Sequence, residues 1–134
     1  MVDFQYKDSY GVKDLEEIVR ILRAPGGCPW DAEQTHQSIR RNFLEEAYEA
    51  VEAIDEGSPE HLEEELGDVL LQVVMHARME QEAGRFDLDG VADGICKKLI
   101  YRRPHVFGDV AVSGTGEVLS NWEAVSYTHL TLPT

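Results

Sequence analysis

The sequence is poor in cysteine and in long hydrophobic runs, and each shortage excludes a class of protein. Its two cysteines, Cys28 and Cys96, are too few and too far apart for a disulfide framework. Two thiols and no signal peptide predict a cytoplasmic protein. The longest apolar stretch, residues 69–77, is interrupted by Gln72 and His76. It is far shorter than the ~20 residues of a membrane-spanning helix, so we expect no membrane partner.

Basic residues are also scarce, since 12 Lys and Arg stand against 26 Asp and Glu, a formal net charge of -14. Nucleic-acid backbones are bound by Lys and Arg, so this balance argues against a nucleic-acid partner. An acidic protein that handles polyanions needs local compensation, which divalent cations usually provide. With 43% hydrophobic and 28% charged residues in a chain of 134, the composition is that of one soluble globular domain.

The last nine residues, 126–134, differ from the rest because they carry no acidic or basic group other than His129. We expect the domain to comprise residues 1–125 and the tail 126–134 to be a non-native or disordered segment, such as a vector, adaptor or frame-shift product. A genuine frayed end is the alternative.

Strand signals are nearly absent and apolar residues recur with the helical period, which predicts an all-α bundle of four to five helices. Residues 24–31 contain two prolines and two glycines, which predicts a loop. We expect helices over about 12–23, from Ser38 or Thr35 to 56, from a Ser58 cap to 83, from Asp87 or Asp89 to 101, and from Thr115 or Gly116 to Val125.

The helix expected to end at 83 is apolar on more than one side. Leu71 and Met75 lie away from its main stripe, which consists of Leu62, Leu66, Val69, Leu70, Val73, Val74 and Ala77. A helix that is apolar on two sides is buried on two sides. An isolated domain would expose Leu71 and Met75, so we expect a homodimer or a higher homo-oligomer.

Two pairs of carboxylates have matching spacings on consecutive helices. Glu46 and Glu49 are three residues apart, as are Glu65 and Asp68, so each pair shares one side of its helix. The short connection at 57–59 predicts antiparallel packing, which lets the four side chains converge. Four crowded acids repel one another unless a cation lies among them. Oxygen-only ligands favour Mg²⁺ first and Mn²⁺ second.

Acidic residues on helices more often form a solvated face, the interpretation that we give to Glu52, Glu56, Glu60, Glu63 and Glu64. A di-iron carboxylate site is a further alternative, but it requires Glu-x-x-His on core helices. The one such pair, Glu33 and His36, lies beside the predicted loop.

These motifs resemble a known family. Glu45-Glu46-x-x-Glu49 followed by Glu65-x-x-Asp68 is similar to the E-E-x-x-E…E-x-x-D signature of the all-α NTP pyrophosphatases, which include MazG, the dimeric dUTPases and the phosphoribosyl-ATP pyrophosphohydrolases. Four further blocks narrow the resemblance to MazG: G-C-P-W-D at 27–31 with Q-T at 34–35, E-L-G-D at 65–68, R-R-P-H-V-F-G-D at 102–109, and N-W-E at 121–123. The similarity extends from about 15 to 125.

The resemblance implies magnesium-dependent hydrolysis of a nucleoside triphosphate to its monophosphate and pyrophosphate, with Mn²⁺ as a possible substitute. It implies Glu46, Glu49, Glu65 and Asp68 as metal ligands, in agreement with the helical geometry. The implied catalytic residues are Glu45, Glu46 and Glu49, with Glu45 orienting or deprotonating water.

The implied nucleotide contacts are Asn42, Lys98, Arg102 and Trp122. Lys98 and Arg102 are four residues apart and so share one side of the helix, which is consistent with both contacting a triphosphate. Compensation of the helix dipole is the alternative for this basic pair, and packing is the alternative for Trp122. Cys28 and Trp30 are assigned to anchoring the loop.

Many bacterial MazG proteins carry two such domains, and the first can be weak or inactive. The chain can therefore be the N-terminal half of a tandem protein. The rival interpretations are a nucleotide-binding regulator that turns over poorly and a non-catalytic oligomerisation module.

Overall fold

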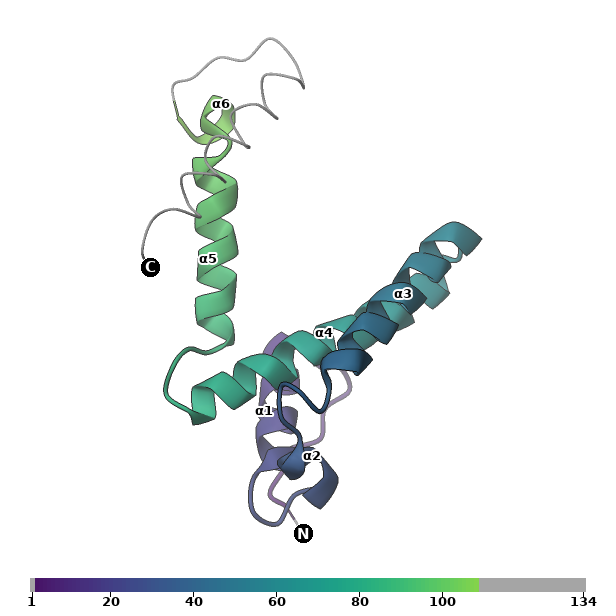
Figure 1. Ribbon diagram of the computed structural model, residues 1–134, viewed down its shortest axis with the longest axis vertical. Helices are drawn as coiled ribbons and strands as arrows, with labels where there is room; N and C mark the ends of the chain where they lie inside the picture. The colour runs from purple at the N-terminus through teal and green to yellow at the C-terminus, as the bar shows by residue number, and fades with distance from the viewer. Residues whose placement is uncertain (1, 109–134) are drawn as a thin grey trace. The chain divides into compact units, whose positions relative to one another are not determined.

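The computed structural model describes residues 2–108, which contain helices and no β-strand (Figure 1). The helices are α1 (Val12–Arg23), α2 (Pro29–Glu33), α3 (Arg40–Glu56), α4 (Pro59–Glu82), α5 (Leu88–Tyr101) and α6 (Pro104–Phe107). The all-α prediction is confirmed. The helix expected near 115–125 and the tail 126–134 lie outside the described residues.

Local signals in the sequence explain where the long helices begin and end. The bounds of α1 are those predicted, and the Asp14 carboxylate accepts a hydrogen bond from the Gly11 N–H at 2.8 Å. At the start of α4, Ser58 Oγ accepts from the His61 N–H at 3.2 Å. Gly57 and Gly84 follow α3 and α4 with φ of 71° and 73°, a left-handed conformation that glycine adopts without strain.

The helices differ from the prediction in three places. Pro29 opens the one-turn helix α2 inside the segment predicted as a loop, because proline is well suited to a first helical turn. The next helix, α3, begins later than predicted because Thr35 and Ser38 hydrogen-bond each other in a turn, with N–H to hydroxyl distances of 2.8 and 3.1 Å. The third difference is α6, which was not predicted.

The core of the first part of the chain lies around α4, which packs against both α1 and α3. Val19 of α1 and Val74 of α4 are 0% and 2% exposed, and Ile39 lies in the same cluster. Met75 also belongs to it and is 4% exposed. The prediction that an isolated domain exposes Met75 is therefore wrong, because α1 and α3 cover two sides of α4 within one chain. Leu71 is exposed, as expected.

Arg23 fastens the segment between α1 and α3. Its guanidinium donates to the backbone oxygens of Asp31 and Gln34 at 2.7 and 3.0 Å and forms a two-bond ion pair with Glu82 of α4. Cys28 is half-buried in this segment, but Trp30 is 58% exposed. The exposure of Trp30 argues against its assignment as a loop anchor, and the contacts of Arg23 hold the segment instead.

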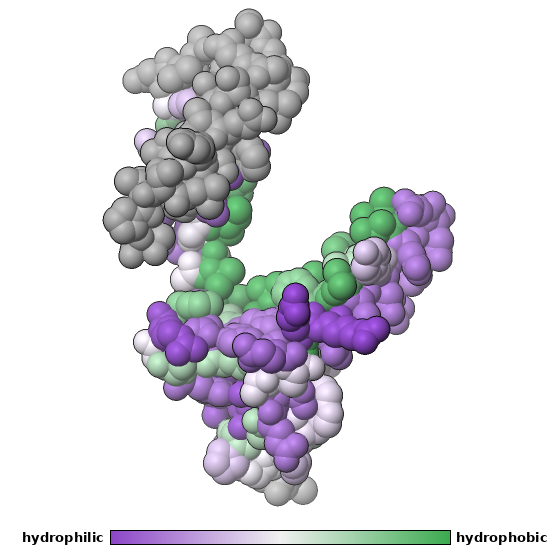
Figure 2. Space-filling view, in the orientation of Figure 1, coloured by the Kyte–Doolittle hydropathy of each residue, from purple (hydrophilic) through white to green (hydrophobic). Residues whose placement is uncertain are grey.

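Large hydrophobic side chains remain exposed along α3. Leu44, Tyr48, Val51 and Ile54 are each at least half exposed, and their spacing places them along one side of the helix. We call these four residues the α3 stripe. The side of α3 that packs on α4 instead carries Ala50 and Ala53, which are buried. Figure 2 shows hydrophobic surface along one side of the α3–α4 pair and hydrophilic surface along the other.

The chain divides into two compact units, residues 1–88 and 89–134. Most of α5 and all of α6 belong to the second. None of the helices within residues 2–108 is long and apolar enough to span a membrane.

Candidate metal centre

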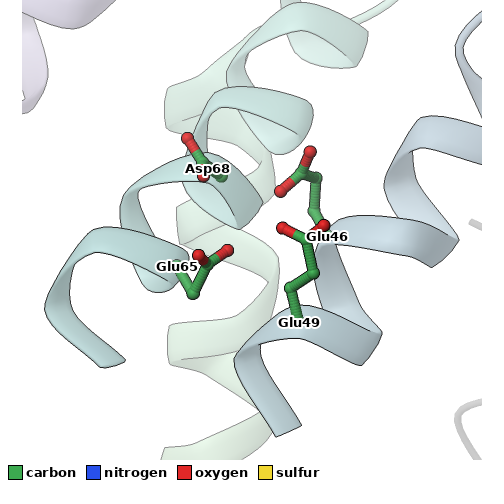
Figure 3. Close-up of side chains that lie close together, drawn as sticks. All are labelled: Glu46, Glu49, Glu65 and Asp68. Carbon is green, nitrogen blue, oxygen red and sulfur yellow. The ribbon is translucent and has the colours of Figure 1, made fainter. Parts of the chain in front are cut away.

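The α3–α4 pair brings the four predicted carboxylates together. Glu46 and Glu49 extend from α3 toward Glu65 and Asp68 of α4 (Figure 3). Each residue contributes one oxygen to a group whose atoms all lie within 4.8 Å of one another. Within residues 2–108 this is the one group of three or more potential ligands in such proximity.

Local sequence explains this convergence. Gly57 ends α3 with a left-handed turn, and Ser58 and Pro59 start α4 at once, so the two helices run antiparallel. Ala50 and Ala53 are 7% and 0% exposed, and their small side chains allow the helices to approach closely. The two pairs of acids therefore face each other across the helix contact.

Two of the four carboxylates hold buried oxygens without a hydrogen-bond partner. Glu65 is 7% exposed, Glu46 and Asp68 are half-buried, and Glu49 is exposed. The Oε2 atoms of Glu46 and Glu65 are buried, and no hydrogen bond reaches either one from the residues described. Leaving a buried oxygen without a donor costs free energy. A cation among the four side chains would remove that cost, so the residues fit a divalent metal ion.

The electrostatics of the group agree with this fit. Burial raises the pKa of Glu46 above its usual value, and the charges of Glu49, Asp68 and Glu65 add to the shift. The pKa of Glu65 is raised as well, first by burial and then by the neighbouring Glu49. The charged form of each acid is thus destabilised by its neighbours, and a hard cation would reverse this.

His61, which no motif in the sequence marks as a site residue, contacts this group. Its Nε2 lies 3.2 Å from Oε1 of Glu65, one turn further along α4, and its Nδ1 lies 2.7 Å from Oε2 of Glu56. A hydrogen bond with Glu56, followed by the charges of both acids, raises the pKa of His61. The signal available in the sequence was the four-residue spacing from His61 to Glu65. The assignment of Glu56 to a purely solvated face is thus incomplete.

The other residues predicted on α3 lie beside the group. Glu45 is exposed and forms an ion pair with Arg41, whose Nε is 3.4 Å from Glu45 Oε1. Asn42 is half-buried one turn before Glu45 and Glu46. Neither belongs to the converging set, so their catalytic and nucleotide-binding roles stay predictions.

The predicted basic contacts belong to the second unit. Lys98 is half-buried on α5. Arg102, the first residue after α5, is 6% exposed, and its backbone N–H donates a hydrogen bond to the backbone oxygen of Lys98. Trp122 lies outside the described residues. The contacts of these three residues with a nucleotide stay predictions.

A polar network connects His36, in the segment between α2 and α3, to the second half of α4. Nδ1 of His36 lies 2.6 Å from Nδ1 of His76, and Nε2 of His36 lies 2.6 Å from Glu80 Oε2. Arg85 donates to both oxygens of Glu80. Hydrogen bonds from Arg85 and then His36 lower the pKa of Glu80 to about 2. His36 thus pairs with Glu80 and not with Glu33, which removes support from the di-iron alternative.

An open, mostly apolar cavity of about 500 Å³ lies between this network and α3. Phe43, Leu44 and Ala47 of α3 line it together with the rings of His36 and His76. On this helix, Phe43 lies three residues before Glu46 and Ala47 lies one residue after it. The cavity therefore lies along the helix that supplies half of the acidic group.

Comparison with known proteins agrees with this arrangement. Residues 34–107 match the family model of the MazG nucleotide pyrophosphohydrolase domain. The chain is 46% identical over 113 residues to the "Nucleoside triphosphate pyrophosphohydrolase/pyrophosphatase MazG" of Thermotoga maritima, a match that covers 84% of this chain and 43% of that protein. It is 47% identical over 112 residues to the nucleoside triphosphate pyrophosphohydrolase of Escherichia coli K12, with 83% and 43% covered.

A third relative is the uncharacterized protein YabN of Bacillus subtilis, 53% identical over 111 residues, which cover 83% of this chain and 23% of YabN. The chain thus spans less than half the length of these relatives. The fold is similar to the crystal structure of a mazG-related protein from Thermotoga maritima, with a TM-score of 0.69, 26% identity, and 87% and 99% of the two chains covered. On these matches, and on the acidic group that accompanies them, the chain belongs to the MazG nucleotide pyrophosphohydrolase family.

Proposed function

We propose that the chain hydrolyses a nucleoside triphosphate to its monophosphate and pyrophosphate, with Mg²⁺ held by Glu46, Glu49, Glu65 and Asp68. The observation that carries this proposal is the convergence of four carboxylate oxygens within 4.8 Å. Within the same group, the Oε2 atoms of Glu46 and Glu65 are buried without a hydrogen-bond partner among the described residues. Oxygen-only ligation favours Mg²⁺, and Mn²⁺ is the natural substitute.

When bound, Mg²⁺ would neutralise charge on phosphate oxygens and lower the pKa of a coordinated water. Glu45 precedes the first proposed ligand, and its exposed side chain is accessible to water. We assign it the role of orienting or deprotonating the water that attacks the α-phosphorus as pyrophosphate leaves. Lys98 and Arg102 are the proposed triphosphate contacts, because this acidic chain needs local positive charge for a polyanion.

We assign the apolar cavity beside α3 to binding of the nucleobase. Its volume of about 500 Å³ accommodates a flat ring, and Phe43, His36 and His76 supply ring faces for stacking. Asn42, half-buried on the same helix, supplies an amide for hydrogen bonding.

A homodimer is the proposed assembly, because four large hydrophobic side chains of the α3 stripe are each more than half exposed within residues 2–108. Burial of such a stripe is the usual driving force for association. The two free thiols agree with the reducing cytoplasm proposed as its location.

Release of pyrophosphate from a mixed panel of nucleoside triphosphates, with and without Mg²⁺, tests the proposal. We expect release that requires Mg²⁺ and that is absent in Glu49→Gln. Nucleotide binding without release would instead support the poorly active regulator, and neither binding nor release would support the oligomerisation module.

A further inference from the structure

His61 lies between two carboxylates at the junction of α3 and α4. Its Nδ1 faces Glu56, the last residue of α3, at 2.7 Å, and its Nε2 faces Glu65 at 3.2 Å. The imidazole therefore links the end of one helix to an acidic side chain on the other. Both contacts fix the plane of the ring.

Glu65 is the most buried acid of the group, with a side chain that is 10% exposed. Its two oxygens have different surroundings. Oε1 is held by His61, whereas Oε2 is buried and has no hydrogen-bond partner in the part of the chain that is described. A carboxylate held at one oxygen by a ring of fixed orientation keeps its other oxygen in a fixed direction.

Stability of the helix start does not account for a histidine at this position. Ser58 caps α4, and His61 is the third residue of the helix. Glu or Gln at this place would complete a capping box with Ser58. An imidazole that donates from both nitrogens carries positive charge, which the N-terminal end of a helix disfavours. The contact with Glu65 supplies a reason that the helix start does not.

We propose that His61 is a positioning residue for the metal centre, which holds Oε1 of Glu65 so that Oε2 is directed at the cation. Glu56 in turn fixes the ring of His61 through Nδ1. This inference rests on the proposed function, because it requires Glu65 to be a metal ligand. Hydrogen-bond partners of metal ligands typically contribute about 10–100-fold to metal affinity.

A pair of variants at this position separates the hydrogen bond from the charge. His61→Gln keeps an N–H donor the same number of bonds from the backbone as Nε2, whereas His61→Leu has a similar size and no donor. Neither side chain is charged, so the attraction or repulsion of the cation is the same in both. His61→Ala is a second variant without a donor, in case leucine prevents folding.

The test measures Mn²⁺ binding by the full chain, without nucleotide, from the electron paramagnetic resonance signal of free Mn²⁺. We expect His61→Leu and His61→Ala to bind Mn²⁺ about 10–100-fold more weakly than His61→Gln. Circular dichroism and the melting temperature in chelator show whether all three variants are folded. If His61 had a purely structural role, the donor-free variants would lower the melting temperature in chelator and leave Mn²⁺ affinity unchanged.

Equal affinity of His61→Gln and the donor-free variants would overturn the positioning role. If the wild-type chain and Glu65→Gln bind Mn²⁺ equally well, or if neither binds, the assignment of Glu65 as a ligand is itself wrong and this inference fails with it. Loss of binding in Glu65→Gln together with unchanged binding in His61→Leu refutes only the role of His61.

Discussion

Replacing Asp68 by asparagine should stabilise the metal-free chain and abolish its response to Mg²⁺. Asparagine has nearly the same shape, so the half-buried packing of residue 68 is retained. The substitution removes one of four charges whose oxygens lie within 4.8 Å of one another. At this separation, two like charges repel by roughly 1 kcal/mol in a water-like dielectric.

Asp68 has three such neighbours, and salt and partial exposure reduce each repulsion. We therefore expect the free energy of unfolding in chelator to rise by about 1–2 kcal/mol, which corresponds to a few degrees in Tm. In saturating Mg²⁺ the order of stability should reverse, so that the wild-type chain is more stable than Asp68→Asn. At 100 times the dissociation constant, a bound ligand stabilises a protein by about 2.7 kcal/mol. The wild-type chain gains this, and Asp68→Asn does not.

Thermal unfolding followed by circular dichroism, in chelator and in Mg²⁺, measures both effects on one sample. Glu64→Gln is the matched control, because Glu64 is an exposed carboxylate on the same helix and lies outside the acidic group. It should leave both the chelator and the Mg²⁺ curves nearly unchanged. A Mg²⁺-induced rise in Tm of Asp68→Asn equal to that of the wild-type chain, or unchanged hydrolysis at saturating Mg²⁺, would refute the proposed metal centre.

Three further predictions concern other parts of the chain. The pKa of Glu80 is about 2 in the folded chain, against an ordinary value of 4.5, so its contribution to stability is complete above pH 4.5 and is lost as the pH falls toward 2. The difference in Tm between the wild-type chain and Glu80→Gln should therefore shrink as the pH falls over that range. A difference in Tm that stays constant would contradict the ion network. Val51→Glu, which charges the α3 stripe, should convert a dimer to a monomer in sedimentation equilibrium, whereas a wild-type chain that is already monomeric at micromolar concentration would contradict the proposed assembly. Arg102→Ala should lower kcat/KM by about one to two decades, because a charge-assisted hydrogen bond is worth roughly 1.5–3 kcal/mol. A loss of roughly 0.3–1 kcal/mol of stability with unchanged kinetics would instead indicate a helix-dipole role. Lys98→Ala, at a half-buried residue, should show the same decrease in kcat/KM.

Much of the helical arrangement could be predicted because its signals are local. The bounds of α1 and the Ser58 cap of α4 follow from periodicity and capping residues, which act within a few positions of the chain. The same is true of the acidic group, since three-residue spacings and a short turn are enough to bring Glu46 and Glu49 opposite the acids of α4.

What could not be predicted is which side of a helix faces which neighbour. The hydrophobic period of α3 indicates a buried stripe, yet the α3 stripe is exposed and the helix packs on α4 through Ala50 and Ala53. Met75 was misplaced for a related reason, since periodicity reveals a second apolar side without revealing that α1 and α3 lie on both sides of α4. The networks of Arg23 and His36 join residues 40 or more positions apart, which no local pattern specifies.

The buried carboxylates connect stability to function in this chain. Small alanines let α3 and α4 approach closely, and that approach buries the Oε2 atoms of Glu46 and Glu65 where no donor is described for them. A sequence selected for stability alone would place apolar or uncharged residues there, because buried charges without partners are costly. The acids are tolerable if a cation completes the contact between the helices. On this reasoning the metal centre is part of the helix packing, and binding of the cation should both complete the site and rigidify the α3–α4 pair that presents it.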